Sequence, residues 1–384
     1  MKDICTLFKE IFGAPPEAVC SAAGRVNLIG EHVDYCGGKV LPAALTLKCR
    51  VAVRKNGRNS VRIAATDIPD RAEIDYADLS AYRGLQWGRY QAGVADEMKR
   101  AGYRLVGCDM LYECSVPFGA GLSSSAAIEV ATAYALAKAG GNAIDKPALA
   151  VLCQRAENDY CGVSCGIMDQ YASANGVAGH AMLLDCATLH CEQIPLDLGD
   201  CALVLANCNK PHSLVASRYN ERRQQVEAAL KAARELFPVQ TLAALIPDML
   251  EACRPRMEEV VYRRARHVVT ECGRVSRSAE VLRRGGLEEF GKLLNASHIS
   301  LRDDYDVTGP ELDALAQAAW ERPECLGSRM TGAGFGGCTV SLVKKAGIGA
   351  FIEHVGAAYR AAVGRDASFY IAETADGIVE EALS

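Results

Sequence analysis

The segment from Pro117 to Ala127 constrains the fold more than any other part of the sequence. It reads Pro-Phe-Gly-Ala-Gly-Leu-Ser-Ser-Ser-Ala-Ala, after a mostly apolar run at Met110–Val116 and before an Ala-rich run at Ala126–Ala139. This order predicts a short buried strand, a glycine turn and a helix. Glycines permit positive φ and close backbone approach, and the orphan amides at a helix N-terminus attract anions. The segment therefore predicts a phosphate-binding turn.

Two better-known phosphate motifs do not match this turn. No Gly-Lys-Ser/Thr triplet follows Gly119, as a Walker loop requires, and Ser124 stands where the dinucleotide fingerprint has its third glycine. The missing glycine and the serine run argue against a nucleotide-dependent dehydrogenase. A plain glycine turn before a helix capped by Ser123 is the alternative. Three consecutive serines exceed what capping requires, so we favour phosphate binding.

The composition is that of an ordinary globular protein. The 384 residues, half of them hydrophobic, are enough for two or three domains. A net charge of -5 gives no basic surface for nucleic acid or an anionic membrane, so neither partner is expected. The 17 cysteines are scattered without a C-x-x-C pair, which argues for reduced core thiols. The charged N-terminus and the absence of a long apolar run predict a cytoplasmic protein.

The two halves of the chain differ in character. Strand-like runs at Ala18–Ile29 and Val51–Ala65 alternate with helical segments in the first half. The second half is rich in helical sequence, including Phe237–Asp248, and ends in strand-like runs that predict a sheet of its own. We expect an N-terminal domain over 1–190 and a C-terminal domain over 191–384.

A cluster of polar side chains follows the first predicted strand. Arg25 lies within it, and after Gly30 the chain presents Glu31, His32 and Asp34 in quick succession. Carboxylates and imidazole can each bind sugar hydroxyls, so this segment is a candidate polyol-binding loop. The alternative is a charged turn held by local salt bridges.

Two further segments carry candidate chemistry. Gly332–Gly337 has four glycines in six residues, which predicts either a flexible hairpin or a backbone that approaches a ligand or another loop closely. Asp169 follows a break at Gly166, and Glu157 lies on the helix predicted before it. A carboxylate in that position can accept a hydroxyl proton or hold a cation. Asp169 as the N-cap of the following helix is the alternative.

In this order and spacing the four segments resemble the GHMP family of small-molecule kinases over nearly the whole chain. The stretch Arg25–Gly38 resembles the galactokinase signature within that family, and Arg263–Val275 and Ser297–Tyr305 add to the match. The resemblance implies an α+β, two-domain fold with the active site in the cleft between the domains. We also expect a monomer.

The resemblance implies ATP-dependent phosphorylation of the C1 hydroxyl of α-D-galactose, which yields galactose 1-phosphate and ADP, with Mg²⁺ as the metal. Asp169 matches the carboxylate that takes the C1 hydroxyl proton, and Arg25 matches the residue that steadies the transition state. The other matches are the sugar-binding positions Glu31, His32, Val33, Asp34, Gly166 and Tyr219, the ATP loop Gly119, Ala120, Gly121, Leu122, Ser123, Ser124 and Ser125, and the Mg²⁺ ligands Ser125 and Glu157.

The candidate polyol-binding segment that follows Gly30, hereafter the sugar loop, departs from the family pattern at two positions. Val33 and Cys36 stand where the family usually has Thr and Asn. Because two polar side chains are lost beside the predicted sugar, another sugar 1-kinase, such as an N-acetylgalactosamine or arabinose kinase, is an alternative. A non-catalytic sugar sensor is a second alternative. The presence of Asp169, Arg25 and the serine run argues against a sensor.

Overall fold

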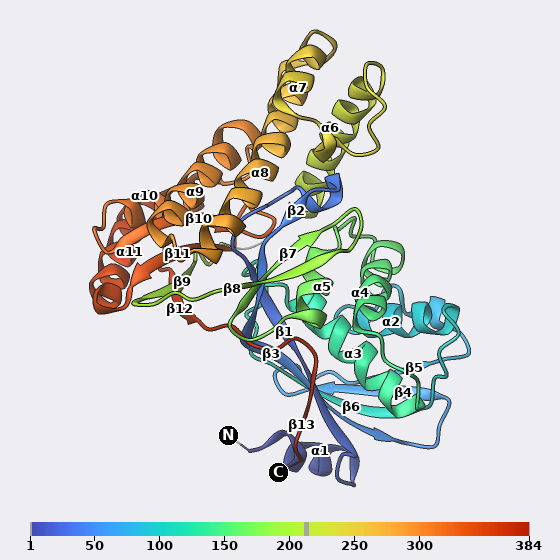
Figure 1. The fold of residues 1–384 in the computed structure, drawn as a ribbon. Helices are drawn as coiled ribbons and strands as arrows, with labels where there is room; N and C mark the ends of the chain where they lie inside the picture. Colours follow the sequence, from blue (N-terminus) through green and yellow to red (C-terminus); the bar gives the residue numbers. More distant parts are fainter. Residues whose placement is uncertain (1, 211–214, 384) are drawn as a thin grey trace.

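The largest sheet is built mainly from the first half of the chain. The computed structural model describes residues 2–210 and 215–383, and its six-stranded sheet has the order β13-β1-β3-β6-β4-β5 (Figure 1). Neighbouring strands pair antiparallel except β4 and β6, which run parallel. The strands are β1 (Ala18–Asn27), β3 (Pro42–Lys55), β4 (Ser60–Ala65), β5 (Ala72–Asp75), β6 (Cys108–Cys114) and β13 (Val379–Glu381).

Helix α3 (Ser124–Gly140) is the central helix on this sheet. It contacts β1 and β3, and most of its residues are small and buried. A helix that is apolar on all sides must be covered on all sides. Here α2 (Arg89–Arg100), α4 (Lys146–Arg155) and α5 (Met168–Asn175) cover it. The short α1 (Ile4–Phe12) packs elsewhere, against β3 and β6.

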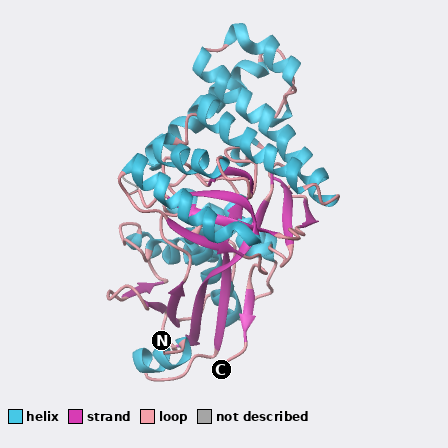
Figure 2. Ribbon diagram, turned by 90° about the vertical axis from the view of Figure 1, so that its left-hand side faces the viewer, coloured by secondary structure: helices cyan, strands magenta, loops and turns pink. Residues whose placement is uncertain are grey.

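The second half of the chain forms its own antiparallel sheet, in the order β10-β11-β9-β12. Figure 1 shows α6 (Val215–Arg234), α7 (Pro247–Cys253) and α8 (Glu259–Arg283) at the end of the molecule away from the chain termini, and Figure 2 shows that this end is built of helices. The strands are β9 (Cys201–Asn207), β10 (Cys325–Thr331), β11 (Cys338–Lys344) and β12 (Ser368–Ala372). The other helices are α9 (Leu287–Ser300), α10 (Gly309–Trp320) and α11 (Ile348–Val363).

Two further features connect the halves. A small sheet in the order β2-β7-β8 contains β2 (Lys39–Val40), β7 (His180–Asp185) and β8 (Cys191–Pro195). Strand β13 returns from the end of the chain to pair with β1 in the first sheet, with Val19 opposite Glu381. The division into 1–190 and 191–384 stays a prediction, and β13 lies across it.

The α+β class is confirmed, but two local expectations are wrong. The run Val51–Ala65 is broken at Gly57, which has a φ of 69°, and β3 and β4 are not neighbours because β6 lies between them. The segment Phe237–Asp248 is not one helix. It contains a 3₁₀ turn at Leu242–Ala244, and α7 begins only at Pro247, a residue that favours the first turn of a helix.

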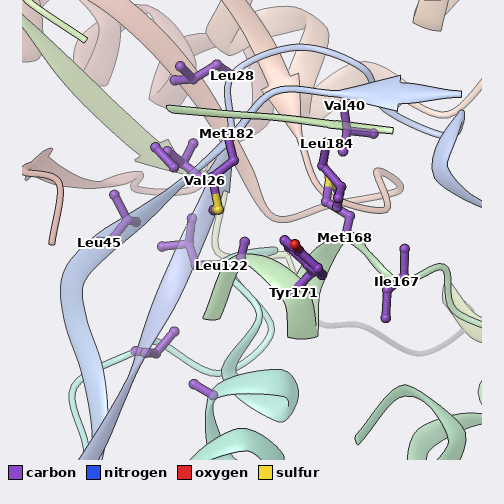
Figure 3. Packing of buried hydrophobic residues seen from close by; sticks show 14 of the residues in the cluster. Val26, Leu28, Val40, Leu45, Leu122, Ile167, Met168, Tyr171, Met182 and Leu184 are labelled. Atoms are coloured by element: carbon purple, nitrogen blue, oxygen red, sulfur yellow. The ribbon is translucent and has the colours of Figure 1, made fainter. Parts of the chain in front are cut away.

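The predicted phosphate loop, Gly119–Ser125, is anchored in the hydrophobic core through Leu122. Leu122 is buried and belongs to the same apolar cluster as Val26 of β1, Tyr171 of α5 and Met182 of β7 (Figure 3). Burying one large apolar side chain stabilises the fold by about 1.5–3 kcal/mol. This packing anchors the loop in the core, while its glycines and serines line a cleft.

Candidate active site

One cleft collects most of the predicted site residues. Its volume is about 740 Å³, within the usual range for small-molecule sites. It is lined by residues from both halves of the chain, including Tyr219 and Asn220 from α6 and Gly332 and Gly334 from the second glycine-rich segment. The predicted residues that line it are Arg25, Glu31, His32, Asp34, Gly119, Gly121, Ser123, Ser124, Ser125, Glu157, Gly166, Asp169 and Tyr219.

Three predicted residues do not line the cleft. Val33, Ala120 and Leu122 are each at most 1% exposed and belong to the hydrophobic core. Cys36, the other position that departs from the family pattern, is also buried, and its thiol donates to the carbonyl of His32 at 3.7 Å. The side chains of Val33 and Cys36 therefore do not face the cleft.

The phosphate loop has the predicted strand-turn-helix form. Gly119 and Gly121 have φ values of 69° and 74°, and α3 begins at Ser124. Ser123 occupies the N-cap position but makes no capping hydrogen bond, because its φ is 61° and its hydroxyl instead donates to Asp169 Oδ2 at 2.6 Å. The capping alternative for Ser123 is wrong. Its hydroxyl ties the loop to the candidate base.

The segment Gly332–Gly337, hereafter the glycine loop, packs directly on the phosphate loop. A Cβ at Gly332 would lie 2.9 Å from the Gly121 carbonyl oxygen, and one at Gly121 would lie 3.0 Å from the Thr331 carbonyl oxygen. A Cβ at Gly337 would come within 3.1 Å of the Ala120 carbonyl oxygen. Only glycine permits backbones this close with positive φ. Of the two sequence alternatives, the structure supports close approach to another loop.

Arg25 reaches the cleft through an irregularity in β1. The register with β3 shifts between Ala23 and Arg25, and such a bulge redirects the side chains that follow it. At this point the Arg25 amide donates to the Leu122 carbonyl at 3.1 Å. The guanidinium donates from Nη1 to the Gly121 carbonyl at 2.6 Å and pairs through Nη2 with Asp169 Oδ1 at 2.7 Å. Arg25 thus joins the phosphate loop to the candidate base.

Asp169 lies at the centre of this arrangement. It is in the first turn of α5, whose N-cap is Ile167, so the alternative of Asp169 as the N-cap is wrong. Its side chain keeps 29% of its surface exposed, whereas the Arg25 side chain keeps 4%. The carboxylate is held by two partners and still faces the cleft. That combination suits a group that contacts a substrate.

The sugar loop is held tightly by the protein. Glu31 accepts from the Asn27 side-chain amide at 2.8 Å and from the backbone amide of Gly332 at 2.7 Å. Burial, then the Asp169 carboxylate, raises the pKa of Asp34 to about 7. A Cβ at Gly166 would lie 1.8 Å from Asp34 Oδ2. The absence of a side chain at Gly166 therefore makes room for the Asp34 carboxylate.

The candidate metal ligands are adjacent. Glu157 lies on the π-helical turn Ala156–Tyr160 that extends α4, and burial, then Asp169, raises its pKa to about 7. The Ser125 hydroxyl bonds to this carboxyl group and acts in the opposite direction on its pKa. Within the described residues, no group of three or more His, Cys, Asp or Glu could hold a metal ion. One hydroxyl and one carboxylate suit Mg²⁺, which takes few protein ligands when bound with nucleotide phosphates.

The sequence analysis missed two buried residues, Gln170 and Glu129, that hydrogen-bond to each other next to the candidate metal ligand Glu157. The Gln170 amide donates to Glu157 at 2.6 Å and to Glu129 at 3.1 Å, and both Gln170 and Glu129 are fully buried. Glu129 lies one helical turn after Ser125 on α3, a spacing that places both on one face. An acidic residue among the small and apolar residues in the middle of α3 was the signal available in the sequence.

A smaller cavity of about 50 Å³ adjoins the cleft. The two share Tyr90 and Phe118, and the smaller one is otherwise lined mainly by apolar and aromatic residues, among them Trp87 and Ile128. Phe118 is 57% exposed at this boundary. The cavity thus extends the cleft past the start of the phosphate loop.

No helix in the described part of the chain is long and apolar enough to cross a membrane.

Comparison with known proteins agrees with this geometry. Residues 6–55 match the galactokinase galactose-binding signature, residues 89–177 the GHMP kinases N terminal domain, and residues 278–361 the GHMP kinases C terminal family. The galactokinase of Halalkalibacterium halodurans is 42% identical over 99% of this chain and 97% of its own length. That of Lactiplantibacillus plantarum is 42% identical over 98% of both chains.

Solved structures give the same result. The Lactococcus lactis galactokinase complexed with galactose superposes with a TM-score of 0.96 at 38% identity, over 98% of both chains. The Methanococcus jannaschii mevalonate kinase, at 16% identity and a TM-score of 0.67 over 93% of this chain and 98% of its own, shares the fold. Fold and loops together define a GHMP kinase. Within that class, the chain belongs to the galactokinase family, whose members are ATP-dependent sugar kinases.

Proposed function

We propose that this chain transfers the γ-phosphoryl group of ATP to the C1 hydroxyl of galactose. The observation that carries the proposal is the position of Asp169, whose partly exposed carboxylate lies in the cleft between the sugar loop and the phosphate loop. A group there can contact the acceptor hydroxyl while ATP lies on the phosphate loop. Arg25 and Ser123 hold it in that position.

Asp169 takes the proton of the C1 hydroxyl as that oxygen attacks the γ-phosphorus. Its Oδ1 is paired with Arg25 and its Oδ2 accepts from the Ser123 hydroxyl. These two bonds fix the carboxylate but leave lone pairs for the substrate. A positioned general base contributes about 10² to 10⁴ in rate.

Arg25 supplies positive charge beside the reacting oxygens. Its guanidinium cannot lose its proton at neutral pH, and it lies between Asp169 and the Gly121 carbonyl of the phosphate loop. Phosphoryl transfer has a loose transition state, so most of the catalysis comes from positioning and from charge stabilisation. Arg25 would stabilise the negative charge that develops on the oxygen of the C1 hydroxyl.

Ser125 and Glu157 would hold Mg²⁺. Glu157 in the cleft and Glu129 beside it are buried carboxyl groups that share the Gln170 amide, and within the described part of the chain no ion pair joins either to a cationic side chain. The pKa of Glu157 rises because burial and Asp169 disfavour its charge, and a divalent cation would offset both effects. When bound, Mg²⁺ neutralises phosphate charge as it develops. The adenine base would enter the smaller aromatic cavity beside Trp87 and Tyr90.

Galactose is the favoured sugar despite the two departures in the sugar loop. Val33 and Cys36, which replace the family's usual Thr and Asn, are buried and do not line the cleft. Their side chains therefore do not contact a sugar bound in the cleft. Asp34, Gly166 and Tyr219 line the cleft as proposed sugar contacts. The expectation of a monomer stays a prediction.

The test is an ADP-release assay with ATP and Mg²⁺ across a panel of galactose, N-acetylgalactosamine, arabinose and glucose. We expect galactose to give the highest kcat/KM, and ³¹P NMR of the product to identify a 1-phosphate. A higher kcat/KM for another sugar would replace galactose as the substrate. Galactose binding without turnover would instead indicate a sensor.

A further inference from the structure

The side chain of His32 has no polar atom left for a sugar. Its Nδ1 lies 2.8 Å from the Tyr35 hydroxyl and its Nε2 lies 3.0 Å from the Ala333 carbonyl oxygen. Burial lowers the pKa of His32 to about 3, so the ring is neutral. A carbonyl oxygen only accepts, so Nε2 carries the hydrogen and Nδ1 accepts from Tyr35. Both ring nitrogens are therefore used within the protein.

Two hydroxyl groups continue the hydrogen bonding from Nδ1. The Tyr35 hydroxyl donates to His32 and lies 2.8 Å from the Tyr305 hydroxyl, which is left to donate to it. Tyr305 is fully buried, and its ring packs on His32 with the centroids 4.8 Å apart. The Arg222 guanidinium holds the Tyr305 carbonyl at 2.8 Å. The His32 ring is thus held from the second half of the chain.

The other end of this arrangement is the glycine loop. His32 donates to the carbonyl of Ala333, while its neighbour Glu31 accepts from the amide of Gly332 at 2.7 Å. Two consecutive side chains of the sugar loop therefore bind two consecutive residues of the glycine loop. The glycine loop in turn rests on Gly121 of the phosphate loop, with space for no Cβ between them. The contacts run without interruption from the sugar loop to the phosphate loop.

We propose that the His32 side chain is a positioning group for the nucleotide side of the site and not a sugar ligand: its Nε2–H holds the glycine loop, and through it the phosphate loop, in register with the sugar loop. This inference rests on the proposed kinase function. His32 has a φ of 60° and is 4% exposed, a left-handed conformation that His adopts more readily than most residues. The strained conformation aims the ring at the glycine loop.

The test separates sugar binding from nucleotide binding. In His32→Ala, calorimetry should give a galactose Kd within about twofold of wild type, while the KM for ATP and the Kd of a non-hydrolysable ATP analogue rise about tenfold or more, because a misplaced positioning loop has effects of this order. His32→Gln, whose amide N–H can reach the Ala333 carbonyl, should recover most of the loss. A galactose Kd that rises as much as the ATP KM would overturn the proposal.

Two further variants keep the test decisive. Tyr35→Phe removes the donor to Nδ1 without touching the Ala333 contact, and it should shift the ATP KM in the same direction by a smaller factor. Tyr76→Phe is the matched control, because it removes a part-buried hydrogen bond, as Tyr35→Phe does, to the Val106 carbonyl at 3.2 Å at the far edge of the first sheet. It should leave both constants unchanged. If His32→Ala does not fold, an unaltered ATP KM in Tyr35→Phe refutes the proposal.

Failure of the proposed function gives a different result. Wild-type protein that does not phosphorylate galactose would refute the kinase assignment, and the calorimetric Kd values for galactose and the ATP analogue would still measure the role of His32. If the wild-type protein phosphorylates galactose but His32→Ala binds the ATP analogue with an unchanged Kd, the positioning role alone is refuted.

Discussion

Substitution of Gly332 by alanine tests the contact between the glycine loop and the phosphate loop. Gly332 has a φ of 89°, and a Cβ there would lie 2.9 Å from the Gly121 carbonyl oxygen and 3.1 Å from the Gly121 Cα. Both atoms belong to backbone, so neither can rotate away. The two loops must therefore separate by several tenths of an ångström, or the Gly332 backbone must change conformation.

The expected magnitude has two parts. A left-handed conformation costs an alanine about 1–2 kcal/mol relative to glycine. Gly57 has a φ of 69°, and a Cβ there would meet no atom within 4 Å, so Gly57→Ala should show this part alone. The displacement of Gly121 adds a second part in Gly332→Ala. Because misplacements near 1 Å can reduce rates about 10²-fold, we expect kcat/KM for ATP to fall about 10- to 100-fold.

The assay compares Gly332→Ala with Gly57→Ala. Urea unfolding measures the free energy of unfolding of each, and initial rates at saturating galactose give kcat/KM for ATP. Gly57→Ala should lose stability but retain wild-type kinetics, whereas Gly332→Ala should lose both. If the two variants lose similar stability and Gly332→Ala keeps wild-type kcat/KM, then the loop contact does not position the phosphate loop.

Three other predictions concern the cleft. Asp169→Ala should lower kcat about 10²- to 10⁴-fold with little change in the Kd of an ATP analogue; near-normal turnover would contradict its role as the base. Gly166→Ala should raise the galactose KM about tenfold or more without changing nucleotide affinity, because its Cβ would displace the Asp34 carboxylate; an unchanged KM would show that the loop adapts. The third prediction is a pH dependence. The pKa of Asp34 is about 7 in the folded protein and about 3.9 in the unfolded chain. Between these two pH values Asp34 is protonated in the folded state and ionised in the unfolded state, so the free energy of unfolding of the wild type falls as the pH rises from about 4 to about 7. Asp34→Asn lacks this titration and should gain about 1–3 kcal/mol over wild type between pH 4 and 8 in urea unfolding, the lower values reflecting solvent in the cleft. Parallel stability profiles for the two proteins would refute the shift.

Much of the local structure follows from the sequence because it depends on residues close together in the chain. The strand-turn-helix around Gly119 and Gly121 requires positive φ and a helix start within a few residues, and the structure has both. The pairing of β4 with β6 could not be predicted, because it depends on which strands meet in the folded sheet. The buried pair of Glu129 and Gln170 was missed for the same reason.

The sequence by itself determined that the chain has a phosphate loop, a polar loop suited to a sugar, a glycine-rich segment and a carboxylate beside a glycine break, and their order identified the family. Only the tertiary structure decided which of these groups touch. The bond from Arg25 to Asp169 and the contact of Gly332 with Gly121 join residues far apart in the chain, so local conformational preferences cannot specify them. The phosphate loop can form from local preferences, but the packing of both halves of the chain sets its distance from the sugar loop.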